Sequence, residues 1–239
     1  QGLKESKGYI EDIIKKRCSL CSSNLKVFLG GFSQGAALSL FTGLSSNLEI
    51  SGIGLGTGTF GREIDEEKSF EIMDYAVENG ITFFDTAEAY GGGQAYEIRK
   101  QAYGTTDVRE KSTEMSSSEL IIGRWMKSRG TRKNIELCTK ISGGKARPDQ
   151  IRTALDASLE RLGTDFVDIY KIHSPDVNTP IAESLDAMGE QVDLGKIKII
   201  GGANYNGEQI AEMLDQAKKN KYRRFEIMQP NYNMAVPEA

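Results

Sequence analysis

Short apolar runs alternate with longer amphipathic segments along most of the chain. An apolar run of this length, bounded by turn residues, is typical of a buried strand, whereas a longer amphipathic segment is typical of a helix with one buried face. The alternation predicts strands near Lys26–Gly30, Gly52–Thr57, Ile81–Asp85, Ile135–Thr139, Phe166–Ile172, Ile197–Gly201 and Phe225–Gln229. Strands that alternate with helices form parallel sheets, which are either open or closed into a barrel.

The amphipathic segments predict helices near Tyr9–Leu20, Gln34–Gly43, Asp65–Asn79, Ser118–Ser128, Pro148–Leu162, Thr179–Leu194 and Asn206–Lys219. Several boundaries carry residues that begin or end helices: Asp65 and Thr179 as N-caps, Pro148 and Pro180 in first turns, and Gly80, Gly163 and Gly195 just past the ends. The stretch Gln94–Ser117 is polar and has weak periodicity, so we expect a long surface insertion there.

Composition and charge narrow the class of protein. The formal net charge of −4 over 239 residues argues against general nucleic-acid binding, which needs a basic surface. No apolar run approaches the roughly 18–20 residues of a membrane span, and the polar start Gln1–Lys7 lacks the apolar core of a signal peptide. The three cysteines do not form a disulfide framework. We therefore expect a cytoplasmic protein that binds neither nucleic acid nor membrane.

Polar side chains stand at the carboxyl ends of successive predicted strands, where parallel sheets place their chemistry. These residues are Asp85 and the nearby Tyr90, then Lys140, His173, Asn204 and Gln229. One such residue could be an ordinary turn former, but their common position on five strands indicates a site. Because His173 is the single histidine of the chain, sites with two histidine ligands are excluded.

The chemistry of this set favours proton transfer to a carbonyl group. A tyrosine has an ordinary pKa near 10, and a neighbouring lysine ammonium is expected to lower that pKa while an aspartate holds the lysine. A histidine beside the phenol can orient a carbonyl oxygen. No side chain donates a hydride, so the hydride must come from a cofactor.

Residues from about Leu48 to Pro237 resemble the aldo-keto reductases. The resemblance rests on the segments IGLGTGTFG, FFDTAEAYGGG, LCTK, DIYKIHSPD, GKIKIIGGANYN and MQPNYN. It implies a (β/α)₈ barrel, NADPH as cofactor, and aldehydes or ketones as substrates. It further implies the following roles: Tyr90 as general acid, Lys140 and Asp85 as its tuning pair, His173 as the group that orients substrate, and Gly56, Thr57, Asp85, Asn204 and Gln229 at the cofactor.

Two departures from the family pattern bear on activity. Ala203 replaces the usual serine before the amide-binding Asn204, which removes a hydrogen bond typically worth ~1 kcal/mol. The sequence also ends just after the sixth barrel strand of the pattern, so we expect an incomplete barrel without the strands that complete the cofactor cradle. Unpaired strand edges would then favour self-association.

The segment KVFLGGFSQGAALSLFTGL resembles a different family, the acyl-protein thioesterases and carboxylesterases of the α/β-hydrolase fold. Its Gly-x-Ser-x-Gly motif centres on Ser33, between a predicted strand and a predicted helix. We therefore expect a hydrolase-like strand–helix unit over residues 1–47 and a reductase-like portion over residues 48–239, with an insertion at 94–117. A right-handed crossover from this unit should place the strand Lys26–Gly30 beside the first reductase strand. A serine esterase acting through Ser33 and an inert binding scaffold are the alternative functions.

Overall fold

The computed structural model describes residues 54–105 and 109–230 with their side chains, and the backbone of residues 26–32 and 35–41. Its strands are β1 (Lys26–Phe32), β2 (Gly35–Phe41), β3 (Gly54–Gly56), β4 (Phe83–Asp85), β5 (Glu136–Ile141), β6 (Val167–Ile172), β7 (Ile197–Ala203) and β8 (Ile227–Gln229). Its α-helices are α2 (Glu66–Glu78), α3 (Gly92–Tyr103), α4 (Ser117–Arg129), α5 (Pro148–Leu162), α6 (Ile181–Asp193) and α7 (Gly207–Asn220), and a 3-10 turn covers Arg132–Asn134.

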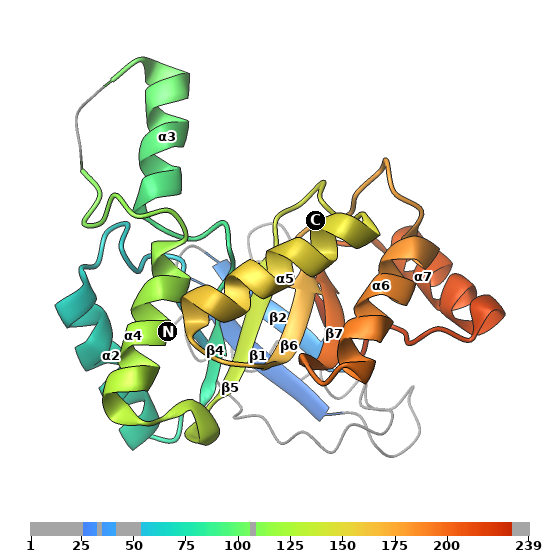
Figure 1. Ribbon diagram of the computed structural model, residues 1–239, viewed down its shortest axis with the longest axis horizontal. Helices are drawn as coiled ribbons and strands as arrows, with labels where there is room; N and C mark the ends of the chain where they lie inside the picture. Colours follow the sequence, from blue (N-terminus) through green and yellow to red (C-terminus); the bar gives the residue numbers. More distant parts are fainter. Residues whose placement is uncertain (1–25, 33–34, 42–53, 106–108, 231–239) are drawn as a thin grey trace, which may run out of the picture.

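The six strands from β3 to β8 are parallel, and each pairs with the next one along the chain. Helices α2, α4, α5, α6 and α7 lie on the outside of this curved sheet (Figure 1). Apolar side chains between the sheet and the helices form the main core, which includes the fully buried Phe84, Trp125, Leu155 and Tyr170. The predicted parallel α/β architecture is therefore confirmed over this part of the chain.

The first two strands differ from the prediction for the amino-terminal segment. β1 pairs in parallel with β3 through Gly31 and Leu55, so the predicted strand does lie beside the first strand of the parallel set. The predicted helix Gln34–Gly43 is wrong, because β2 occupies Gly35–Phe41 and pairs antiparallel with β1 on one side and with β8 on the other. A strand satisfies the backbone groups at the edge of β8, which a helix cannot do.

The pairing of β1 and β2 with the outer strands also contradicts the expectation of unpaired sheet edges. Both outer strands of the parallel set, β3 and β8, have a paired neighbour among the described residues. Self-association therefore remains a prediction, but β3 and β8 do not present the unpaired edges on which it was based. The predicted helix Tyr9–Leu20 lies outside the described residues.

Most helix boundaries follow the predicted signals. Asp65 caps α2 by accepting a hydrogen bond from the backbone N–H of Lys68 at 2.9 Å, and α5 begins at Pro148 as predicted. Thr179 is not an N-cap, because α6 is preceded by Pro180 and the Thr179 hydroxyl donates to Asp176 instead. The glycines after three helices, Gly80, Gly163 and Gly195, have the expected left-handed backbone, with φ between 63° and 76°.

Helix α3 occupies part of the stretch that we expected to be a long surface insertion. It projects away from the barrel (Figure 1), and only Gly92 and Gly93 at its start are buried. A helix with so little buried surface has no apolar face, which explains the weak periodicity of its sequence. Side-chain contacts between Arg99 and Glu110 connect it to the segment that returns to the barrel.

Two successive layers of side chains fill the inside of the sheet. The first is apolar and consists of Phe83, Cys138, Ile169, Ile199 and Ile227. The residues two positions further along the same strands are Asp85, Lys140, Lys171, Gly201 and Gln229. Because alternate residues of a strand share a face, the second layer stands directly above the first, at the carboxyl ends of the strands. The interior of the sheet thus contains an apolar layer and, next to it at the carboxyl ends of the strands, a polar layer.

Outside that interior, Asp168 on β6 connects three segments of the chain. Its carboxylate is 3% exposed and accepts hydrogen bonds from the backbone N–H of Leu137 at 2.9 Å, from Arg132 Nη2 at 2.9 Å and from Lys198 Nζ at 2.7 Å. Arg132 and Lys198 also lie over the ring of Phe166. Asp168 therefore stabilises the contacts between β5, β6 and β7.

We predict that Asp168→Ala lowers the free energy of unfolding by about 3 kcal/mol, because it leaves the half-buried Arg132 without its charged partner and the buried N–H of Leu137 without its acceptor. Asp168→Asn, which keeps one carbonyl oxygen, should cost less. Lys198→Met is the matched control and should cost less than about 1 kcal/mol, since the side chain of Lys198 is 51% exposed. Urea unfolding followed by circular dichroism measures all three, and equal losses in Asp168→Ala and Lys198→Met would contradict the assignment.

Candidate active site

The polar layer is organised around the carboxylate of Asp85. One of its oxygens accepts a hydrogen bond from Lys140 Nζ at 2.7 Å, and the other accepts one from Lys171 Nζ at 3.0 Å. Lys140 also donates to the backbone oxygen of Thr86 at 2.8 Å, and Lys171 to Oε1 of Gln229 at 2.8 Å. Both lysines are 1% exposed. Two ammonium groups thus flank one buried carboxylate.

Tyr90 and His173 lie above this layer. Their ring centroids are 5.4 Å apart with the planes at 81°, and Nζ of Lys140 is 4.8 Å from the centroid of the Tyr90 ring. Tyr90 belongs to the loop between β4 and α3, which is fixed by the hydrogen bonds Tyr90 N–H to Ala87 O and Ser118 N–H to Tyr90 O. The four predicted catalytic residues Asp85, Tyr90, Lys140 and His173 are therefore brought together.

Asn204 and Gln229 complete the opposite side of this group. The backbone N–H of Asn204 donates to the backbone oxygen of Gln229 at 3.0 Å, and its side-chain Nδ2 donates to the backbone oxygen of His173 at 2.7 Å. Asn204 has a positive φ of 60°, a conformation that asparagine tolerates better than most residues. Since Nδ2 donates to the backbone oxygen of His173, the acceptor that this amide can offer to a ligand is its side-chain oxygen.

Gly56 and Thr57 lie at the end of β3 and play different parts. Gly56 is half-buried and pairs with Asp85 in the sheet. Thr57 is fully buried, and both its backbone N–H and its hydroxyl lie 3.1 Å from the backbone oxygen of Asp85. Ser118 donates a further hydrogen bond to the backbone oxygen of Thr57. Thr57 therefore holds the backbone of Asp85 in place, and it exposes no surface to a ligand.

The pKa of Asp85 is well below its ordinary value. Burial alone would raise this pKa, but the ammonium groups of Lys140 and Lys171 more than compensate and favour the carboxylate. The apolar layer below has the opposite effect on Cys138, where burial raises the pKa of the thiol to about 12. The carboxylate at the centre of the site is thus ionised, and the thiol beneath it is protonated.

The pKa of Tyr90 is raised above its ordinary value, mainly by burial and then by the charge of Asp85, with Lys171 opposing the shift. This corrects the expectation that a neighbouring lysine would lower it. The ammonium of Lys140 lies over the ring face and is itself paired with Asp85, so it does not outweigh the burial of the phenol. Tyr90 is consequently a protonated phenol at neutral pH.

The pKa of His173 is lowered to about 4 by burial first and by the positive charge of Lys140 and Lys171, while Asp85 raises it. The imidazole is therefore neutral at neutral pH, and it can make hydrogen bonds without competing with Tyr90 as an acid.

Lys171 is a charged member of the layer that the sequence motifs did not single out. It stands within the segment DIYKIHSPD, two residues before His173, and the segment was quoted for its histidine. A usable signal was present, since Lys171 is two residues from the apolar Ile169 and shares its face of β6, which points into the barrel. A charged residue at such a position requires a buried partner.

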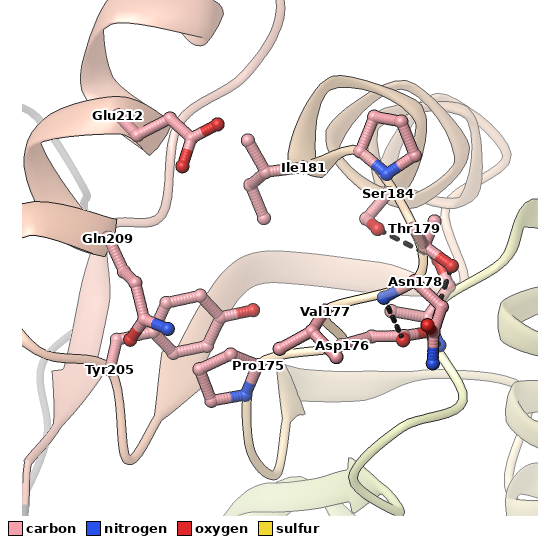
Figure 2. Close-up of a pocket in the computed structure, with 12 residues that line it drawn as sticks. Pro175, Asp176, Val177, Asn178, Thr179, Ile181, Ser184, Tyr205, Gln209 and Glu212 are labelled. Carbon is pink, nitrogen blue, oxygen red and sulfur yellow. Dashed lines mark hydrogen bonds between the residues drawn. The ribbon is translucent and has the colours of Figure 1, made fainter.

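A separate pocket of about 560 Å³ lies beyond the carboxyl end of β6. Figure 2 shows it between the loop that carries Asp176 and Val177 and the side chains of Tyr205, Gln209 and Glu212. The Asp176 carboxylate is already occupied by the backbone N–H groups of Ala146 and Asn178 and by the Thr179 hydroxyl. None of the predicted catalytic residues lines this pocket. The pocket is therefore separate from the candidate active site at the strand ends.

The fold and the site define a protein of the (β/α)-barrel class with its polar residues at the carboxyl ends of parallel strands. Comparison with known proteins identifies the family within this class, because the Aldo/keto reductase family matches residues 52–239. The chain belongs to the aldo/keto reductase family.

Individual relatives agree with this placement. The uncharacterized oxidoreductase YrpG of Bacillus subtilis is 32% identical over 202 residues, which cover 79% of this chain and 56% of the relative. The crystal structure of the thermostable aldo-keto reductase Tm1743 with the inhibitor epalrestat matches 75% of this chain and 57% of its own, with a TM-score of 0.58 and 29% identity. A Klebsiella pneumoniae aldo-keto reductase in complex with NADPH matches 70% of this chain and 50% of its own, with a TM-score of 0.56 and 26% identity. The chain spans about half the length of the relatives that it matches.

The amino-terminal resemblance is also confirmed, since the Phospholipase/Carboxylesterase family matches residues 1–73. Ser33, the nucleophile of the alternative esterase function, lies outside the described residues. The residues after it form β2 and not the helix that follows the serine in a nucleophile elbow. Over the described residues 26–32 and 35–41, the element after the serine is a strand where that motif has a helix.

We predict that the single imidazole of the chain titrates with a midpoint near pH 4 in the folded protein, below the ordinary value of 6.5. The charged and titratable groups around it are Asp85, Lys140, Lys171 and the phenol of Tyr90. Proton NMR of the histidine ring, over the range in which circular dichroism shows an intact fold, measures the midpoint. The urea-unfolded chain is the control and should titrate near 6.5.

The same shift has a consequence for stability. Between about pH 4 and 6.5 the unfolded chain binds a proton on His173 that the folded chain does not, so this contribution to stability is complete above 6.5 and is lost as the pH falls towards 4. A folded-state midpoint at 6.5 or higher would show that the folded and unfolded chains do not differ in this way in proton binding by His173, and that the imidazole is solvated.

Proposed function

We propose that this chain reduces small aldehydes or ketones to alcohols with NADPH, in the manner of its family, and that residues 48–239 carry this activity. The observation that carries the proposal is the convergence of Tyr90 and His173 over the buried Asp85–Lys140 pair. These four side chains come from separate strand ends and loops, and their convergence provides a proton donor and an orienting group around one point. The NADPH complex of the Klebsiella pneumoniae relative supports the choice of cofactor.

In this proposal Tyr90 is the general acid. The nicotinamide, when bound, supplies the hydride, and the carbonyl oxygen becomes strongly basic as its carbon is reduced. The raised pKa of Tyr90 keeps the phenol protonated until that moment. The O–H proton then passes to the oxygen, and the ammonium of Lys140 over the ring face stabilises the phenolate that remains.

His173 and Asp85 have supporting roles in the same step. The neutral imidazole of His173 lies edge-on to the phenol ring and can hold the carbonyl oxygen by a hydrogen bond. Asp85 fixes Lys140 and, through the backbone oxygen that Thr57 holds, the end of β4. Asp85 thus acts on the reaction by positioning Lys140.

The amide groups of Asn204 and Gln229 fit the carboxamide of a nicotinamide ring. Asn204 can offer its side-chain oxygen as an acceptor, because Nδ2 donates to His173. Gln229 keeps its NH₂ as a donor because Oε1 accepts from Lys171. A carboxamide offers one accepting oxygen and one donating NH₂, so the two residues complement it. Ala203 adds no hydroxyl to this set, and Gly56 lies at the neighbouring strand end.

The first test is fluorescence titration of the purified chain with NADPH. We expect saturable binding with a Kd of about 10 μM or tighter, corresponding to roughly −7 kcal/mol. The absence of binding up to about a millimolar would reject the proposal in favour of an inert scaffold.

The second test is Tyr90→Phe, which removes the transferable proton and little volume. We expect NADPH binding to be retained while turnover of an aromatic aldehyde falls by about 10²- to 10⁴-fold. Tyr103→Phe, on the exposed end of α3 with 80% of the residue exposed, is the matched control and should keep full turnover. Turnover in Tyr90→Phe equal to that of the control would remove Tyr90 from the mechanism.

A further inference from the structure

Lys171 is a buried cation whose place in the site goes beyond the four residues of the proposed mechanism. It is 1% exposed, and its ammonium lies between Asp85 Oδ1 at 3.0 Å and Gln229 Oε1 at 2.8 Å, with the Phe83 ring centroid at 6.0 Å. Lys140 already provides Asp85 with one cationic partner. A second lysine is therefore not needed to neutralise the carboxylate.

The surrounding chain makes room for this side chain. Gly201 occupies the corresponding position on the neighbouring strand β7, and a Cβ there would lie 3.2 Å from Cγ of Lys171 and 2.5 Å from the backbone oxygen of Ile227. The residue below Lys171 on the same face is the apolar Ile169. Because an ammonium is costly to bury, an apolar residue would fill this space at lower cost if packing were the only requirement.

The contacts of Lys171 determine the direction of the Gln229 amide. An ammonium has donors and no acceptor, so the atom of Gln229 that faces it is the oxygen, and the NH₂ group points away. The same ammonium also holds the carboxylate that fixes Lys140 under Tyr90. One side chain thus contacts both the residue proposed to hold the cofactor and the residue that supports the proton donor.

We propose that Lys171 is a positioning residue that presents Gln229 to the nicotinamide carboxamide as a hydrogen-bond donor and fixes it relative to the Asp85–Lys140–Tyr90 group. This inference rests on the proposed function. It predicts that Lys171 contributes to cofactor affinity through Gln229, and that its charge acts on the neighbouring imidazole even when no cofactor is bound.

The first experiment is a double-mutant cycle on NADPH affinity with Lys171→Met, Gln229→Ala and the double variant. Methionine keeps the unbranched shape of the lysine stem and removes the donor. We expect Kd to rise about tenfold in each single variant and no further in the double variant, because both remove the same oriented amide. Lys198→Met, a lysine on β7 bound to Asp168, is the matched control and should leave Kd unchanged. Additive losses in the cycle would overturn the inference.

The second experiment needs no cofactor. Removal of the Lys171 charge should raise the NMR titration midpoint of His173, since this ammonium lowers the pKa of that imidazole. Lys198→Met should leave the midpoint in place. Where Lys171→Met does not fold, Lys171→Gln removes the same charge, keeps a polar group and serves in both experiments.

The two readouts separate the inference from the proposed function. If the wild-type chain does not bind NADPH, the proposed function and the cofactor role of Lys171 fail together, and the histidine midpoint then tests only whether the charge of Lys171 reaches the site. If the wild type binds NADPH, an unchanged Kd in the Lys171 variants overturns the inference and leaves the proposed function intact.

Discussion

The bond between the carboxylate of Asp85 and its two ammonium partners is the interaction on which the rest of the site depends. A carboxylate in an apolar interior would take up a proton unless nearby positive groups stabilised its ionised form. Here the pairing leaves two positive charges against one negative charge above a layer of apolar side chains. Burial and the charge of Asp85 keep the phenol above protonated against the opposing effect of Lys171, whereas burial and the two ammonium groups keep the imidazole neutral.

The position of this cluster follows from the simplest property of a strand. Each strand of the parallel half-barrel places alternate residues inside, so one apolar layer is followed two residues later by one polar layer. The short loops beyond the strand ends then bring Tyr90 and His173 over that layer. The hairpin of β1 and β2 contributes differently, because it pairs with the two outer strands and supplies none of the described site residues.

The sequence carried enough information to predict the parallel strands, most helix boundaries and the convergence of Asp85, Tyr90, Lys140 and His173, because those features depend on local patterns and on strand register. It was insufficient where tertiary contacts decide. GAALSLF has small residues suited to a helix, yet it forms β2 because the edges of β1 and β8 need a partner. Lys171 could not be recognised as part of the site until the side chains of Asp85 and Gln229 were placed beside it.

The order of the strands also has a consequence for synthesis of the chain. Each parallel strand pairs with the next one made, so the half-barrel can assemble step by step from β3 as the chain leaves the ribosome. The contacts at its centre are far less local, since Lys171 is separated by 86 residues from Asp85 and by 58 from Gln229. The polar layer is therefore complete only after β8 has docked and brought Gln229 to Lys171.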